Sequence, residues 1–358
     1  MHERFQKSKG WLRGGAAACL SALLLFPICA GTAEAASLTG TPVSTADTVR
    51  MLVPVGHTVG IKLYARGVLV VGLTEGKSPA KSSGLEKGDV ILKCNGTAVT
   101  STEQFQSMLQ STQGSAVALQ VRREDDRKTV TVQPERNDQG AWAIGAWIRD
   151  SMAGIGTMTY FDPATNTFGA LGHGITDTDT AQLMPFSSGS ILPSTVKAVK
   201  KGVSGSAGEL RGEFDLDTCL GELSANTDRG VFGSLDSESF AEKLGTALPV
   251  ADPSEIKNGP AAILSNVEGD TVKEYSVEIT KLTPGGSDNR ELLVTVTDPE
   301  LLAATGGIVQ GMSGSPILQD GKFVGAVTHV LLNDPRKGYG IFIESMLENS
   351  CLQAETVA

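Results

Sequence analysis

Short alternating segments of apolar and polar residues, separated by glycine and other turn formers, run through most of this chain. Between about Met51 and Pro134 they read TVGIKLY, GVLVVGL, GDVILKCNG, SAVALQVRRE and KTVTVQP, and their β-branched residues predict strands. In TSTEQFQSMLQS, Phe105 and Leu109 repeat at helical spacing, which predicts one helix with Thr102 as its N-cap. This part of the chain therefore predicts a small β-sandwich with a single clear helix.

The second pattern follows a polar, turn-forming boundary at PERNDQGAW and extends to about Asn349. Its apolar segments are WAIGAWI, GIGTMTYF, FGALGHGI, AAILSNV, YSVEITKL, ELLVTVT, GKFVGAVTHVLL and GYGIFI. Only residues 239–247 and 298–303 favour helices. Many short strands with Gly-rich turns predict a barrel or a pair of barrels, so the fold class is mainly β.

The composition agrees with this pattern, and the net charge disfavours some classes of binding partner. The 358 residues include 42 Gly and 15 Pro but only 5% aromatics, which is typical of a turn-rich and strand-rich protein with two domains. The formal net charge of −10 and the pI of about 5.0 argue against nucleic acid or an anionic membrane surface as the main partner.

The first 36 residues are expected to be a targeting segment. Lys7, Lys9 and Arg13 precede an uncharged stretch over residues 14–33, and Ala-Glu-Ala follows at residues 33–35. This pattern predicts a cleaved signal peptide or a membrane anchor, and either one places the rest of the chain outside the cytoplasm. Residues 37–50 are polar and predict a flexible lead.

The number and spacing of the cysteines predict neither a disulfide framework nor a metal site. Outside the targeting segment the chain has Cys94, Cys219 and Cys351, an odd number at spacings above one hundred residues. Such spacing fits neither a disulfide scaffold nor a zinc site, and no cofactor is expected.

A more specific motif lies in the first domain. The phrase GLEKGDVILKCNGTAV, residues 84–99, resembles the bacterial PDZ modules found in proteases, which implies a PDZ domain over residues 51–135. The segment Val59, Gly60, Ile61 and Lys62 is the expected peptide-binding loop, because a Gly between apolar residues lets backbone N–H groups face a carboxylate beside a free strand edge. A β-sandwich without a peptide ligand is the alternative.

The candidate nucleophile of the second domain, residues 136–358, is Ser313 in GGIVQGMSGSP. A serine hydroxyl needs a base for its proton and N–H donors for the oxyanion that forms. In this pattern the N–H groups of Gly311 and Ser313 could supply those donors. A Gly-Ser turn without catalysis is the alternative, but the Pro and the apolar strand that follow favour the nucleophile.

Four histidines could supply the base. His2 lies at the start of the targeting segment and His57 in the PDZ region, which leaves His173 in FGALGHGITD and His329 in GAVTHVLL. His173 is preferred because it sits between two glycines after an apolar strand and precedes the serine, whereas His329 alternates with apolar neighbours like a core residue. A metal site in HGITDTD lacks a second His or Cys nearby.

The acid that would orient the base has two sets of candidates, and spacing alone slightly favours Asp215 and Asp217. Asp298 ends an apolar strand fifteen positions before Ser313, whereas Asp215 and Asp217 follow His173 by forty-two and forty-four positions. Each of these carboxylates could equally be a cap or a turn former.

Three long segments carry a resemblance: residues 149–175, VTVTDPELL, and GGIVQGMSGSPI with the QDGKFVGAVTHVLLNDP that follows. Together with the hydrophobic N-terminal segment and the PDZ motif, they resemble the SpoIVB peptidase family of endospore-forming bacteria. The resemblance implies a chymotrypsin-like serine peptidase domain in which His173, Asp298 and Ser313 form the catalytic triad.

The same resemblance implies a cellular location and protein substrates. Such a protein would be exported from the forespore into the space between the two sporulation membranes. There it would cleave itself and then a regulatory subunit of an intramembrane metalloprotease complex, which releases processing of a sigma-factor precursor. The alternative is a non-catalytic binding protein that works through the PDZ domain.

Overall fold

The computed structural model describes residues 49–351 apart from residue 77, so the expected targeting segment and most of the lead lie outside the described residues. Strands dominate. They are β1 Met51–Pro54, β2 Thr58–Leu73, β3 Val90–Cys94, β4 Thr97–Ala98, β5 Val117–Arg123, β6 Asp126–Val132, β7 Glu135–Arg136, β8 Trp142–Ala143, β9 Ala146–Asp162, β10 Thr167–Ala170, β11 Phe186–Lys200, β12 Glu209–Phe214, β13 Gly221–Thr227, β14 Gly230–Leu235, β15 Leu248–Pro249, β16 Gly259–Glu268, β17 Thr271–Leu282, β18 Leu292–Val296, β19 Pro316–Gln319, β20 Lys322–Val330 and β21 Lys337–Phe342.

The helices are short. They are α1 Pro79–Ser82, α2 Thr102–Ser111, α3 Ser237–Phe240, α4 Pro299–Thr305 and α5 Ile343–Cys351, with 3₁₀ turns η1 Ala241–Lys243, η2 Pro253–Glu255 and η3 Ser287–Asn289. The helix predicted after residue 101 is present, but its N-cap is Ser101, whose hydroxyl accepts from the N–H of Gln104. Within the described residues, no helix has both the length and the apolar character needed to cross a bilayer.

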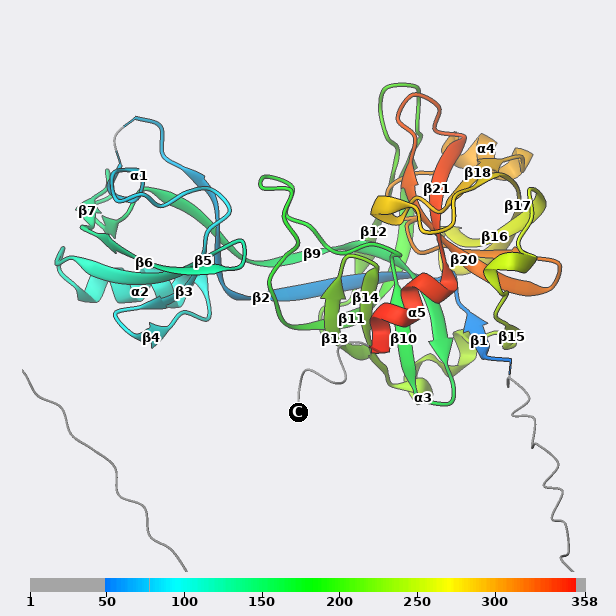
Figure 1. Ribbon diagram of the computed structural model, residues 1–358, viewed down its shortest axis with the longest axis horizontal. Coiled ribbons are helices and arrows are strands. Elements are labelled where there is room, and N and C mark those ends of the chain that lie inside the picture. Colours follow the sequence, from blue (N-terminus) through cyan, green and yellow to red (C-terminus); the bar gives the residue numbers. More distant parts are fainter. Residues whose placement is uncertain (1–48, 77, 352–358) are drawn as a thin grey trace, which may run out of the picture. The chain divides into compact units, whose positions relative to one another are not determined.

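Two long strands, β2 and β9, form the central ladder of the fold and run side by side in Figure 1. The sequence predicted each of them as two separate strands. Their pairing is interrupted between Tyr64 and Leu69, where Gly67 adopts a φ of 85°. A side chain at Gly67 would meet the carbonyl oxygen of Ile91 at 2.5 Å, so the chain needs glycine there. The first half of β2 pairs with β9 and β11, and the second half with β9 and β3.

The PDZ-like part contains the second half of β2, strands β3 to β6 and helix α2. Phe105 and Leu109 of α2 are buried against a core that includes Val70, Ile91 and Leu119. The sequence motif has structural roles here, because Gly84 and Gly88 adopt positive φ angles and the buried Asp89 pairs with Arg123. The carboxylate of Asp89 accepts from the guanidinium at 2.7 and 2.8 Å and from the N–H of Glu86 at 2.9 Å.

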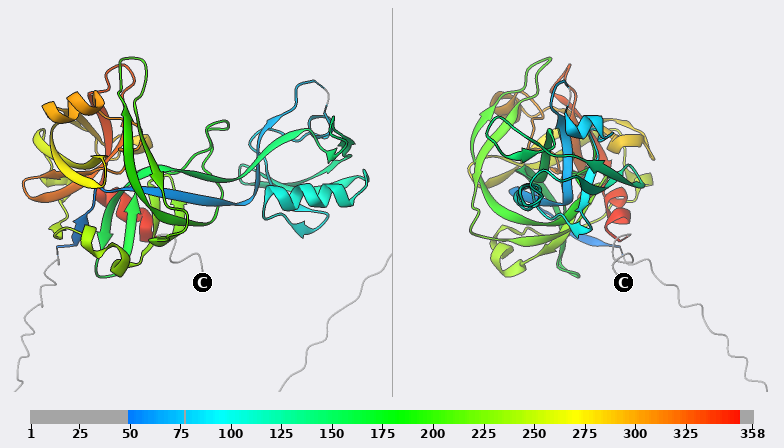
Figure 2. Two further views of the ribbon diagram at one scale, coloured as in Figure 1. Left: turned by 180° about the vertical axis from the view of Figure 1, so that it is seen from behind. Right: turned by 90° about the vertical axis from the view of Figure 1, so that its left-hand side faces the viewer.

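The C-terminal half contains a closed antiparallel barrel in the order β16, β17, β18, β21, β20, β19. Its interior is one apolar cluster, with Ile263, Ile279, Val294, Ile317 and Val327 fully buried. Helix α4 lies next to β18 in Figure 1 and is the orange helix of Figure 2. The alternating apolar residues of YSVEITKL and ELLVTVT supply inward-facing side chains, as the sequence predicted.

Apart from β7 and β8, which pair with each other, the other strands form a 13-stranded sheet, in which β1, β9, β10, β14, β13, β11 and the first half of β2 enclose a second apolar cluster. Helix α5 packs against β14, β20 and β21 and so contacts both sets of strands. These features confirm the mainly β fold, with an N-terminal PDZ-like sandwich followed by a domain that contains a closed barrel.

Several elements differ from the sequence prediction. The segment from Ser239 to Ala247, expected to be one helix, contains the end of α3 and the turn η1 and then leaves helical structure. Strands β11, β13 and β14 and helix α5 were not predicted. The polar residues of β11 and the two glycines of β14 hide any alternation of apolar and polar positions.

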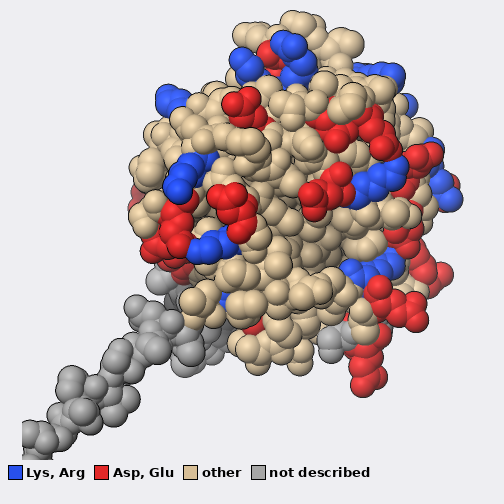
Figure 3. Space-filling model, turned by 90° about the vertical axis from the view of Figure 1, so that its right-hand side faces the viewer, with Lys and Arg blue, Asp and Glu red and all other residues tan. Residues whose placement is uncertain are grey.

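Acidic and basic side chains lie next to one another on the face shown in Figure 3. Ion pairs of this kind join Lys273 to Glu300 and Lys322 to Glu255. Such exposed pairs each contribute little to stability, but they keep the surface charge mixed.

We predict that Asp89→Ala lowers the free energy of unfolding by about 3–5 kcal/mol, because it leaves the partly buried guanidinium of Arg123 without its main partner. Urea unfolding followed by circular dichroism measures the change. Asp138→Ala, at an exposed site in the same part of the chain, is the control and should change stability by less than about 0.5 kcal/mol. Equal effects of the two substitutions would contradict the role given to Asp89.

Candidate active site

Ser313 lies in a tight turn between α4 and β19, and two glycines shape this turn. Gly311 and Gly314 adopt φ angles of 98° and 99°, which side chains other than glycine rarely tolerate. A Cβ on Gly314 would also lie 2.1 Å from the carbonyl oxygen of Thr157. The Ser313 hydroxyl is half-buried and donates to the carbonyl oxygen of Thr328 at 2.7 Å. The G-x-S-G spacing is therefore a requirement of the backbone geometry.

Neighbouring strands fix the peptide groups of this turn. The carbonyl of Gln310 accepts from the N–H of Leu210 at 2.8 Å, and the carbonyl of Met312 accepts from the N–H of Ser315 at 3.0 Å. Because a trans peptide holds its C=O and N–H on opposite sides, the N–H groups of Gly311 and Ser313 point away from those donors. Neither N–H has an acceptor among the described residues. Two fixed, free N–H groups are what an oxyanion hole requires.

Thr157, in strand β9 of the 13-stranded sheet, holds the same turn by two hydrogen bonds. Its N–H donates to the carbonyl oxygen of Ser313 at 3.1 Å, and its hydroxyl donates to the carbonyl oxygen of Gly311 at 2.7 Å. Thr157 is fully buried. Sequence reasoning missed this residue, because a threonine in an alternating strand gives no signal of such a contact.

His173 follows β10 after two residues with unusual backbone angles. Leu171 and Gly172 adopt φ angles of 71° and 70°, and for a leucine this conformation is a strained exception. Nδ1 of His173 lies 2.9 Å from the carbonyl oxygen of Gly174, which can only accept a hydrogen bond. Nδ1 therefore carries the proton, and Nε2 keeps a lone pair with which to act as a base.

His329 lies beside His173, with ring centroids 5.2 Å apart. The sequence predicted His329 as a core residue, whereas the structure leaves it half-buried at the wall of the pocket that contains Ser313. Burial, and then the nearby His173 and Arg290, lower the pKa of His329 to about 4. Burial also lowers the pKa of His173, although the hydrogen bond to Gly174 by itself would raise it. Both rings are therefore neutral at pH 7.

One pocket of about 380 Å³ brings these groups together. His173, Gly311, Ser313, Thr328 and His329 all line it. His173 follows β10 of the 13-stranded sheet, whereas His329 and the serine turn belong to the barrel half, so both halves contribute to the pocket. The described residues form no group of three or more His, Cys, Asp or Glu side chains placed to hold a metal ion.

The candidate acids lie outside this pocket. Asp298 is the N-cap of α4, where its carboxylate accepts from the N–H of Leu301 at 3.0 Å and from the N–H of Ser276 at 3.4 Å. Asp215 is exposed and accepts from the N–H of Asp217 and the hydroxyl of Thr218 within a surface turn. A catalytic role for Asp298 stays a prediction.

The expected PDZ peptide loop is not a loop in this structure. Val59, Gly60, Ile61 and Lys62 lie within β2 and pair with β9 on one side and β11 on the other. Their backbone groups are thus engaged in two ladders, and no strand edge is open beside them. The apolar residues around Gly60 that suggested a carboxylate loop instead fit a buried central strand.

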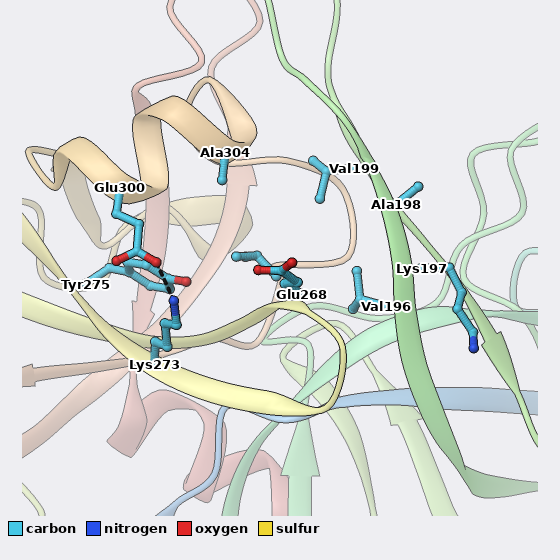
Figure 4. A pocket seen from close by; sticks show the side chains of 10 residues that line it. Val196, Lys197, Ala198, Val199, Glu268, Lys273, Tyr275, Glu300 and Ala304 are labelled. Carbon is cyan, nitrogen blue, oxygen red and sulfur yellow. Dashed lines mark hydrogen bonds and ion pairs between the residues drawn. The ribbon is translucent and has the colours of Figure 1, made fainter.

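A second cavity, of about 270 Å³, lies between β11, the β16–β17 hairpin and α4 (Figure 4). Lys273 and Glu300 form an ion pair at its edge, and desolvation raises the pKa of Tyr275 beside them. This cavity contains neither the serine turn nor the histidines.

Comparison with known proteins assigns a family to this arrangement. The SpoIVB peptidase S55 family matches residues 140–347, and the PDZ domain family matches residues 48–133. A Clostridium perfringens protein whose name is that of a zinc metalloprotease is 38% identical over 68 residues. That match spans 19% of this chain and 20% of the relative's length.

Two solved structures are also similar. The PDZ domain of an SdrC-like protein from Listeria monocytogenes is 24% identical, covering 23% of this chain and 87% of that chain with a TM-score of 0.22. A thermostable serine protease from an extremophilic microorganism is 15% identical, covering 62% of this chain and 94% of that chain with a TM-score of 0.33.

We predict that activity, measured as kcat/KM on a peptide substrate, declines on the acid side with an apparent pKa below 6.5. His173 must be neutral to accept a proton, and burial keeps it neutral to lower pH than an exposed histidine. A decline of kcat/KM centred at or above pH 6.5 would contradict the buried environment of His173.

Stability must be followed in parallel on a Ser313→Ala chain. Because the folded state disfavours protonated His173 and His329, the unfolded chain binds more protons, and unfolding free energy should decrease from pH 6.5 towards about 4. If the decline of kcat/KM coincides with this unfolding, it reflects loss of the folded protein and not protonation of the base.

Proposed function

Because this chain belongs to the SpoIVB peptidase S55 family and carries a PDZ domain, we propose that it is a serine endopeptidase with Ser313 as nucleophile and His173 as general base. The observation that supports the proposal most is the single pocket lined by both residues and by the turn with two free N–H groups. Nucleophile, base and oxyanion donors are the three parts that acyl transfer needs.

In the proposed reaction the Ser313 hydroxyl leaves the carbonyl of Thr328 and turns towards Nε2 of His173, which takes its proton as Oγ attacks the scissile carbonyl. The N–H groups of Gly311 and Ser313 stabilise the negative oxygen of the tetrahedral intermediate. The imidazolium then returns the proton to the leaving amine, and water hydrolyses the acyl-enzyme by the same route.

We further propose that Asp298 is the third member of the catalytic set, as the family resemblance implies. Acting on His173 would require its carboxylate to leave the N–H groups of Leu301 and Ser276. Until then the carbonyl of Gly174 holds the required tautomer of His173.

The biological proposal follows the family. The chain is exported during sporulation, remains secreted or membrane-tethered between the two membranes of the developing forespore, and cleaves itself. It then cleaves a regulatory subunit of an intramembrane metalloprotease complex. The PDZ domain contributes protein recognition, with its peptide contacts outside the paired segment of β2.

We predict that Ser313→Ala abolishes both self-cleavage and labelling by a fluorophosphonate probe, because both require the serine oxygen. Intact mass spectrometry of the full-length chain over time measures the first, and peptide mapping of the labelled residue measures the second. Ser315→Ala, at the neighbouring hydroxyl that donates to Ser265, is the matched control and should keep both activities. Identical behaviour of the wild-type chain and Ser313→Ala would reject the enzyme in favour of a binding protein.

We predict that Asp298→Asn lowers kcat by about 10⁴-fold, because in the proposed contact with His173 an amide would favour the wrong tautomer of the imidazole. The chain should keep its stability, since asparagine is an equally good N-cap. Asp298→Ala should additionally lose about 1 kcal/mol in urea unfolding through the lost cap. Full activity of Asp298→Asn would restrict this residue to its structural role.

A further inference from the structure

A small apolar cavity of about 110 Å³ adjoins the catalytic pocket. The two share Ile155, Leu171 and Ile175, and the smaller cavity adds Ile61 and the segment 152–154 of β9. Its lining contains no charged side chain, and apart from glycine every lining residue is apolar. Because an enclosed apolar cavity of about 150 Å³ accommodates benzene, this one suits an aliphatic side chain better than an aromatic ring.

The cavity lies next to the reacting groups because of the chain around His173. Leu171 and Ile175 stand two residues before and two residues after the proposed base. Ile155 stands two residues before Thr157, which holds the oxyanion turn. A peptide whose carbonyl carbon reaches Ser313 would therefore bring a side chain adjoining the scissile bond to this cavity.

The floor of the cavity is fixed by close packing. A Cβ on Gly156 would lie 2.2 Å from Cδ2 of Leu171 and 3.2 Å from Cδ1 of Ile61, so these two side chains cover the glycine directly. Leu171 is buried and held at a positive φ, which limits its freedom to move aside. The site is thus built before any ligand arrives.

The mouth of the cavity is open at β9. Ala153 and Gly154 are exposed, and a Cβ placed on Gly154 has no heavy atom within 4 Å. Position 154, which lines the cavity, therefore accepts a side chain without a clash.

We propose that this cavity is a specificity subsite that selects an aliphatic side chain, of the size of valine, leucine, isoleucine or methionine, at a position adjoining the scissile bond. The inference rests on the proposed peptidase function and adds the substrate class. Charged and large aromatic side chains are excluded at that position, the first by the cost of desolvation and the second by size.

The experiment compares full-length chains on a peptide library in which each position around the scissile bond is varied. The wild-type enzyme should prefer aliphatic over charged residues at one adjoining position. Gly154→Leu should lower kcat/KM for the aliphatic peptides about 10–100-fold and flatten the preference there, since it adds apolar bulk to a residue that lines the cavity. Gly245→Leu, the same substitution at an exposed glycine with open space and outside both cavities, should leave the preference unchanged.

A second variant tests the opposite change. Met152→Ala enlarges the cavity, so peptides with phenylalanine at the selected position should gain relative to those with valine. Labelling of Ser313 by a fluorophosphonate probe is recorded for every variant. Labelling and cleavage without an aliphatic preference, or a preference unaffected by both variants, overturns the subsite alone. No labelling and no cleavage by the wild-type chain overturns the peptidase function, and the subsite with it.

Discussion

One buried threonine joins the two halves of the candidate active site. Thr157 belongs to β9 of the 13-stranded sheet, yet its N–H and hydroxyl bind two carbonyls of the serine turn in the barrel half. Its own carbonyl accepts from the N–H of Leu171, two residues before His173. Thr157 therefore holds both the backbone near the proposed base and the backbone of the proposed nucleophile. Gly314 is part of this arrangement, because any side chain there would collide with the Thr157 carbonyl.

The hydrogen bonds around the serine turn, those of Thr157 among them, explain why the oxyanion donors are already in place although the nucleophile is not. The four consecutive carbonyls of residues 310–313 are bound, and this leaves the N–H groups of Gly311 and Ser313 fixed and without an acceptor among the described residues. The hydroxyl of Ser313 instead rests on Thr328. In the proposed reaction this hydroxyl turns towards His173, which lines the same pocket, while the backbone donors stay in place.

The sequence predicted the mainly β class, the PDZ domain and most barrel strands, because these depend on local alternation and on a glycine-rich motif. It also singled out Ser313 and His173, which line one pocket. It could not place Thr157 or His329 there, since their roles arise from strands that meet only in the folded chain. The peptide-loop prediction at Gly60 failed for a related reason. A glycine between apolar residues looks the same in a loop and in a central strand, and only pairing partners distinguish them.

The shared strand β2 has a consequence for how this protein can be divided. Residues 140–347 match the peptidase family, but β1 and β2 lie before that range and fill places beside β9 and β11. A fragment cut at the family boundary would expose those two strands as long, unpaired edges, which invite association with other chains. The polypeptide before the peptidase segment thus supplies two strands of the peptidase fold, so the boundary of the family match is not a structural boundary.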